Sequence, residues 1–151
     1  MRKQTRRKLY KLVNPISFVL EGIAAPEGKE LAKVQLRELA AIEAFRTGMA
    51  SLQEWSDLCA MCNLSEIMGR DGVGAEVLQT CEKVENALIR LARQYETANR
   101  MTIKAEELQA MRDLYEYHDL QRKSITRAEY ERYISKTTDR IKSKAPEVKE
   151  I

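Results

Sequence analysis

The sequence is poor in residues that break helices or cross-link a chain. Three prolines and six glycines in 151 residues suit long helices joined by short loops. Three cysteines, an odd number, argue against a disulfide framework and for a reducing compartment, so we expect a cytoplasmic protein. No apolar run approaches the roughly 20 residues that span a bilayer. Residues 9–25 carry Lys11, Asn14, Pro15 and Glu21, which makes them a poor hydrophobic segment for a secretory signal.

The sequence also lacks the common catalytic motifs. It contains no glycine-rich phosphate loop, no H-E-x-x-H and no G-x-S-x-G. His118 is the one histidine, and Glu116 or Asp119 beside it could form an acid–base pair with it. Its helical spacing after Met111 and Tyr115 instead favours a hydrogen-bonded histidine in the core. We expect a non-enzymatic protein that needs no cofactor.

What the sequence does contain is helical periodicity, which is clearest from Val77 to Tyr95. No proline or glycine interrupts this stretch, and charged side chains occupy the rest of its surface. Alternating spacings of four and three align six residues on one stripe: Val77, Cys81, Val84, Leu88, Leu91 and Tyr95. The stripe is too short for a long coiled coil and predicts a bundle core helix.

Similar patterns predict the other helices. Ser51 with Glu54, and Thr126 with Glu129, form capping boxes that begin two of them, and Thr102 is expected to cap another. We therefore predict an all-α fold, a single-domain helical bundle of about six helices. Three parts are expected: a basic arm over residues 1–11, the bundle over 12–144 and a short tail over 145–151.

The segment from about Lys29 to Arg46 is predicted to be a helix with apolar residues on two sides. One side carries Ala32, Leu36, Leu39 and Ala40, and the other carries Leu31, Val34, Ile42 and Phe45. Such a helix is expected to be sandwiched between neighbours. A second copy of the chain could cover apolar surface left open, so we predict a homodimer. A shorter helix is expected before it, between Asn14 and Pro26.

The net charge of +3 is unevenly distributed. Residues 1–30 hold seven basic and three acidic residues, residues 31–121 hold ten and fifteen, and residues 122–144 hold eight and three. Basic ends therefore flank an acidic middle, and a polyanion would be attracted to the ends. The residues expected to contact phosphates are Arg2, Lys3, Arg6, Arg7, Lys8, Lys11, Arg122, Lys123, Arg127, Arg132, Lys136 and Arg140.

Four tyrosines crowd the two C-terminal helices: Tyr115, Tyr117, Tyr130 and Tyr133. Beside basic residues, tyrosine rings could stack on nucleic-acid bases. Alternatively, they fill the groove between adjacent helices with their hydroxyls at the rim. The apolar stripes favour the second interpretation for Tyr115 and Tyr130 and leave both open for Tyr117 and Tyr133.

The cysteines offer one possible metal site. Cys59 and Cys62 form a C-x-x-C pair, which Cys81 and His118 could complete as a Cys₃His zinc set. The pair also shares the apolar side of a helix with Trp55, and free cysteine behaves as a small buried hydrophobe. Because the third and fourth ligands are isolated in the sequence, we expect buried thiols and no metal.

Three stretches of the chain carry a resemblance: residues 2–10 continuing through 14–16, Leu36–Leu39, and Asp113–Arg122. They resemble a group of small phage and prophage proteins of Gram-negative bacteria that has no assigned chemistry. The likeness spans most of the chain. It implies a setting, the bacterial cytoplasm during phage infection, and no role for any particular residue.

Two classes of function follow from these features. In the first, the protein associates with nucleic acid through its basic N-terminal arm and its basic C-terminal helix. In the alternative, the helical body is a protein–protein interaction module that binds and modulates a host protein. The first class requires the two basic ends to converge on one surface, so the position of the basic residues separates the two.

Overall fold

The computed structural model describes residues 27–142 of the chain, and the side chains of residues 30–139. Five helices make up this part: α3 (Glu27–Thr47), α4 (Leu52–Arg70), α5 (Val77–Ala98), α6 (Ala105–Lys123) and α7 (Arg127–Lys142). The described range contains no strand, so the predicted all-α fold is confirmed. The basic arm and the helix expected between Asn14 and Pro26 lie outside the described residues.

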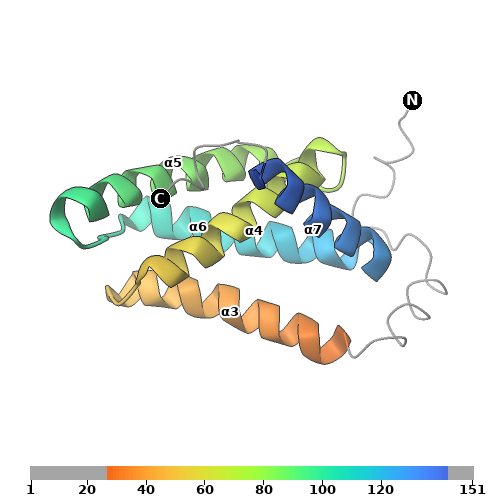
Figure 1. The fold of residues 1–151 in the computed structure, drawn as a ribbon, viewed down its shortest axis with the longest axis horizontal. Coiled ribbons are helices and arrows are strands. Elements are labelled where there is room, and N and C mark those ends of the chain that lie inside the picture. The colour runs from red at the N-terminus through yellow and green to blue at the C-terminus, as the bar shows by residue number, and fades with distance from the viewer. Residues whose placement is uncertain (1–26, 143–151) are drawn as a thin grey trace.

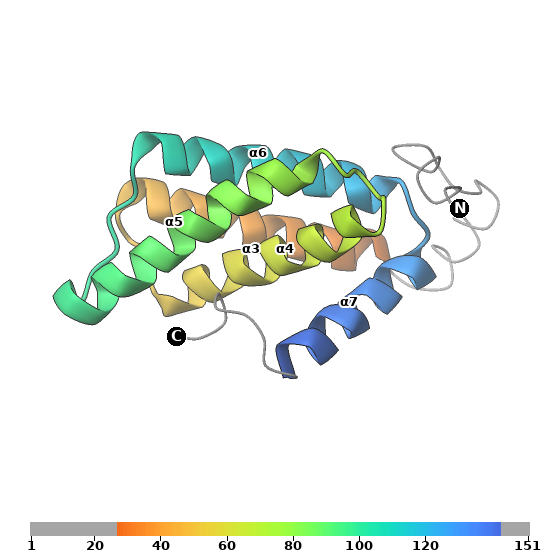
Figure 2. The same ribbon diagram turned by 90° about the horizontal axis from the view of Figure 1, so that it is seen from above.

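Helices α3 to α6 form a bundle in which each helix runs back along the previous one (Figure 1). α4 packs against α3, α5 and α6, and α7 packs against α4 (Figure 2). α3 lies at the edge of the bundle, where it packs on α4 and α6. None of these helices is long and apolar enough to cross a membrane.

Both predicted capping boxes are confirmed. At the start of α4 the Ser51 amide donates to Glu54 Oε1 at 2.7 Å, and the Gln53 amide donates to Ser51 Oγ at 3.2 Å. At the start of α7 the Thr126 amide donates to Glu129 Oε1 at 3.0 Å, and the Glu129 amide donates to Thr126 Oγ1 at 3.1 Å. These bonds satisfy amides that the first helical turn leaves without a partner.

The predicted cap at Thr102 is wrong. α6 begins after Lys104, whose amide donates to Glu107 Oε1 at 2.9 Å. The Thr102 amide donates instead to Gln94 Oε1 at 2.7 Å, so it ties the loop back to α5. The same loop reverses at Asn99, which has a left-handed φ of 58° that asparagine tolerates.

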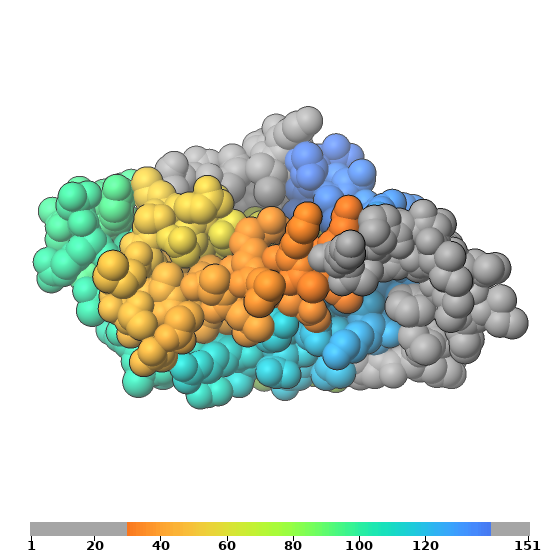
Figure 3. Space-filling view, turned by 90° about the horizontal axis from the view of Figure 1, so that it is seen from below, coloured from red at the N-terminus to blue at the C-terminus, as the bar shows by residue number. Residues whose placement is uncertain are grey.

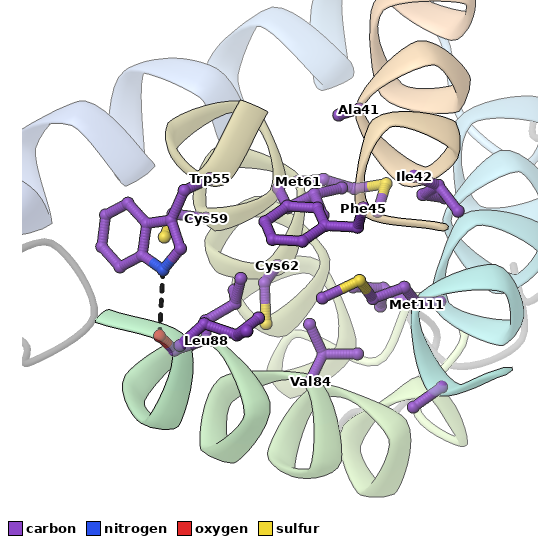
Figure 4. Close-up of a cluster of buried hydrophobic side chains, with 14 of the residues drawn as sticks. Ala41, Ile42, Phe45, Trp55, Cys59, Met61, Cys62, Val84, Leu88 and Met111 are labelled. Carbon is purple, nitrogen blue, oxygen red and sulfur yellow. Dashed lines mark hydrogen bonds between the residues drawn. The ribbon is translucent and has the colours of Figure 1, made fainter. Parts of the chain in front are cut away.

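The stripe predicted on α5 is the centre of the core. Val77, Cys81, Val84, Leu88 and Leu91 are buried, and Tyr95 is half-buried against them. From α4, the Trp55 indole Nε1 donates to the Leu88 carbonyl at 2.9 Å (Figure 4). The hydrogen bond fixes the register of α4 on α5 while the indole ring fills the space between the two helices.

The two sides of α3 have different surroundings. Ile42 and Phe45 are buried against α4 and α6, with 4% and 1% of their surface exposed. Leu36 and Leu39 are 66% and 44% exposed. The expectation that α3 is sandwiched is therefore wrong for the described chain, because no described element covers its outer side.

Candidate functional site

The four candidate zinc ligands do not come together. Cys62 Sγ donates to the Cys81 carbonyl at 3.5 Å and Cys81 Sγ to the Cys62 carbonyl at 3.9 Å, across the contact of α4 with α5. The interaction with Cys81 and burial raise the pKa of Cys62, and burial raises that of Cys59. Within residues 27–142 no three His, Cys, Asp or Glu side chains are placed to hold a metal ion.

His118 is fully buried and belongs to a polar cluster inside the bundle. Gln121 Nε2 donates to the carbonyls of Ser65 at 3.1 Å and Val73 at 2.8 Å, so its Oε1 faces His118 Nδ1 at 2.9 Å. This network assigns the imidazole proton to Nδ1. Burial, with repulsion by Arg122, lowers the pKa of His118 to about 3. An enclosed neutral imidazole fits the core interpretation rather than acid–base catalysis.

Arg122 was predicted to contact nucleic acid, but it is buried and paired with carboxylates. Its side chain is 2% exposed, and its Nη2 lies 3.0 Å from Glu38 Oε1 and 3.3 Å from Asp119 Oδ1. Its Nη1 donates to Glu38 Oε2 at 3.0 Å. Two carboxylates therefore hold the guanidinium inside the bundle, where no phosphate can reach it. Burial raises the pKa of Glu38 and the bond to Arg122 opposes that rise.

Glu38 is not among the residues predicted from the sequence, although the pattern of α3 contains a signal for it. Glu38 lies four residues from both Val34 and Ile42, so it fills the gap in the inner apolar stripe. Arg122 likewise follows His118 by four residues on the stripe of α6. An acidic residue and a basic residue that each continue an apolar stripe are candidates for one buried ion pair.

Lys123 and Arg127, two of the remaining predicted basic residues, are each paired with an acidic side chain. Lys123 Nζ lies 2.9 Å from Asp119 Oδ2, and Arg127 Nε lies 2.9 Å from Glu131 Oε2. Arg132 is exposed, and Lys136 Nζ lies 5.7 Å from the centre of the Tyr133 ring. Residues 127–139 of α7 hold three basic and three acidic residues. Outside the described side chains lie Arg2, Lys3, Arg6, Arg7, Lys8, Lys11 and Arg140.

All four C-terminal tyrosines pack against core clusters. Tyr115 and Tyr117 contact the main core, and Tyr130 and Tyr133 contact a smaller cluster of Leu64, Met68, Val73 and Ile125. The Tyr133 hydroxyl also donates to Asp71 Oδ2 at 2.5 Å. The core interpretation is confirmed for Tyr115 and Tyr130 and extends to the two tyrosines that were left open.

The outer side of α3, which carries the exposed Leu36 and Leu39, lies beside α6 on one face of the molecule (Figure 3). Between these helices lies a groove of about 530 Å³, lined by Leu36, Leu39, Ala40, Ile42, Glu43, Arg112, Tyr115 and Glu116. We define the α3–α6 face as these residues together with the exposed Ala32 and Lys33. Its apolar centre and charged edges resemble the core and rim of a protein interface.

Sequence periodicity predicted the apolar side of α3 but did not predict that this side is exposed. The pattern identified Leu36 and Leu39 as one apolar side of a helix, but only the positions of α4 and α6 show that this side is open.

Comparison of the chain with protein-family models, with curated proteins and with solved structures finds no match.

Proposed function

We propose that the protein is a non-enzymatic protein-interaction module that binds its partner through the α3–α6 face. One observation carries this proposal. α3 buries the carboxylate of Glu38, which is 5% exposed, while Leu36 beside it is 66% exposed. Single exposed leucines are ordinary on protein surfaces, but an apolar side of a helix next to a groove marks an interaction site.

The charge of the described body supports a protein partner over nucleic acid. Residues 27–142 hold eighteen basic and twenty acidic residues, so this part of the chain is slightly acidic. A protein that binds a duplex through its body needs several cations on one surface to displace counterions. The cationic density lies instead in residues 1–11, which hold six basic residues and no acidic one.

The expected cellular setting belongs to the same proposal. A chain that resembles phage and prophage proteins would act in the bacterial cytoplasm, where small helical proteins bind and modulate other proteins. The groove beside Leu36 and Leu39 is suited to an amphipathic helix, whose side chains at spacings of three and four enter such grooves. The competing hypothesis is a nucleic-acid role through the basic arm.

The proposal is tested by photo-crosslinking in bacterial cells that express the chain. A photo-reactive phenylalanine analogue replaces Leu36 in one variant and Ile134, which is 43% exposed on α7, in the matched control. Ile134 lines a hollow with Leu31 and Val34, away from the outer side of α3. We expect nuclease-resistant protein adducts from position 36 and none from position 134.

Two results would overturn this function. Equal adducts from both positions would show that position 36 has no special partner. No adduct from either position, with nucleic acid retained on the purified chain until nuclease treatment, would favour the arm-based nucleic-acid role.

A further inference from the structure

We infer that the partner on the α3–α6 face is a second copy of this chain, with the two α3 helices packed antiparallel about a twofold axis at the level of Glu38. This inference rests on the proposed function, since it names the occupant of the same face.

The apolar residues of the outer side alternate in size in a way that suits self-pairing. Ala32 and Ala40 are small, and Leu36 and Leu39 between them are large and exposed. An antiparallel pair centred on residue 38 sets Leu36 of one copy against Ala40 of the other, and the reverse occurs by symmetry. Small residues facing large ones let two helix backbones approach to about 8–10 Å.

Charge selects the antiparallel direction. The exposed Lys33 lies on the N-terminal side of the apolar centre and the exposed Glu43 on its C-terminal side, separated by about 15 Å along the helix. With the twofold axis at residue 38, Lys33 of each copy faces Glu43 of the other, so the dimer has two such pairs. A parallel pair would set lysine against lysine and glutamate against glutamate. In its own copy, Glu43 also holds Arg46 Nη2 at 2.5 Å.

The groove and the extent of the α3–α6 face set the size of the expected contact. The groove of about 530 Å³ lies next to Leu39 and is closed on the α6 side by Tyr115, so it can receive a leucine of the second copy. On α3 the α3–α6 face runs from Ala32 to Glu43, which is about 17 Å of helix, and two adjacent helices are about 20 Å wide. A projected surface of about 330 Å² is smaller than the roughly 800 Å² per partner that stable dimers bury, which fits a dimer of only micromolar affinity.

Charge reversal tests both the partner and the direction. Sedimentation velocity at about 50 μM, where a dimer of micromolar affinity is populated, should give a species of twice 17.4 kDa for the unchanged chain. Lys33→Glu alone and Glu43→Lys alone should each weaken the dimer about tenfold or more, because each places like charges opposite twice. The double variant Lys33→Glu/Glu43→Lys should restore it, and so should an equimolar mixture of the two single variants.

Each alternative result has a definite meaning. A 17.4 kDa species only, at about 200 μM, overturns the inference. In that case nuclease-resistant adducts from position 36 to a different protein would keep the proposed function, and the absence of any adduct would remove both. A dimer that none of these charge reversals alters would overturn the antiparallel pairing. A circular dichroism melt of each variant checks that the fold is kept.

Discussion

Helices α5 and α3 both carry apolar stripes at spacings of three and four, yet they use them in opposite ways. α5 buries its whole stripe from Val77 to Leu91, and no ionisable carboxylate or amine lies among those side chains. α3 buries Glu38 and leaves Leu36 and Leu39 exposed. The spacing of the apolar residues identifies both segments as helices, but the helices packed around each of them decide which side is buried.

The difference shows that the position of α3 does not follow from hydrophobicity alone. Rotating α3 toward its leucines would bury more apolar surface, but it would remove Glu38 from Arg122. The guanidinium, buried among α3, α6 and α7, would then keep only Asp119 of its two carboxylate partners. Breaking a buried ion pair by removing one partner costs more free energy than a leucine side chain gains by burial. The ion pair therefore fixes the rotation of α3, and the leucines stay outside as a consequence.

The largest expected effect tests that ion pair. Arg122→Met should lower the free energy of unfolding at neutral pH by about 3–5 kcal/mol, since Glu38 then stays buried without its cation. Urea denaturation measures the loss. Adding Glu38→Leu to the same chain should recover most of it, because two apolar side chains need no charge partner. A loss under about 1 kcal/mol in Arg122→Met would mean that the pair does not fix α3.

The second prediction tests the apolar stripe of α5. Leu88 is fully buried beside Trp55, so Leu88→Ala should cost about 2–5 kcal/mol through lost transfer energy and the cavity left behind. Lys83→Ala, on the exposed side of the same helix, should cost under about 0.5 kcal/mol. Arg90 is a poor control, because it binds Glu107 on α6. Similar losses at positions 88 and 83 would mean that the buried side of α5 is wrongly assigned.

The features that the sequence predicted correctly depend on residues close together in the chain and on helical spacing. The class of fold, the stripe of α5 and the boxes at Ser51 and Thr126 each need only residues within a few turns of one another. Thr102 is not the cap, because α6 begins after Lys104; the Thr102 amide instead donates to Gln94 of the preceding helix, a tertiary contact. Such contacts cannot be read from a helix-start motif alone.

The candidate site could be predicted only in part for the same reason. The two-sided pattern of α3 located Leu36 and Leu39, and the expectation of a second copy came from that pattern. Which side stays open depends on the pairing of Glu38 with Arg122, 84 residues apart. The charge totals of residues 122–144 also placed Arg122 on the surface, because a sum over a segment does not distinguish a buried cation from an exposed one.

The third prediction sharpens the contrast between the apolar core and the polar cluster. Because the folded pKa of His118 is about 3, below its ordinary value of 6.5, the folded state resists protonation that the unfolded chain accepts. The loss of folding stability that results from His118 is close to zero above pH 6.5 and grows as the pH falls toward 3. At pH 5 it should amount to about 2 kcal/mol.

His118→Asn isolates that penalty, since the asparagine amide can still donate to Gln121 and does not titrate. The measurement is the free energy of unfolding at pH 7 and pH 5 for both proteins. The fall between the two pH values should be about 2 kcal/mol larger for the unchanged chain. Burial raises the pKa of Glu38, and bonds to Lys123 and Gln35 lower the pKa of Asp119, but both carboxyl groups are common to the two proteins, so their contributions cancel. Equal pH dependence in the two proteins would contradict the buried neutral histidine.

The smallest expected effect completes the comparison of α5 with α3. Leu36 is 66% exposed, so Leu36→Gln removes little buried surface from a single chain and should change the free energy of unfolding by under about 0.5 kcal/mol. Urea denaturation at a protein concentration of about 0.1 μM, low enough to dissociate a micromolar dimer, measures this value. At about 50 μM the unchanged chain should gain stability from dimerisation that the variant lacks, so the two curves should separate as concentration rises. A loss of 2 kcal/mol or more at the lower concentration would mean that part of the chain covers Leu36 within one copy, and the outer side of α3 would then be core like the stripe of α5.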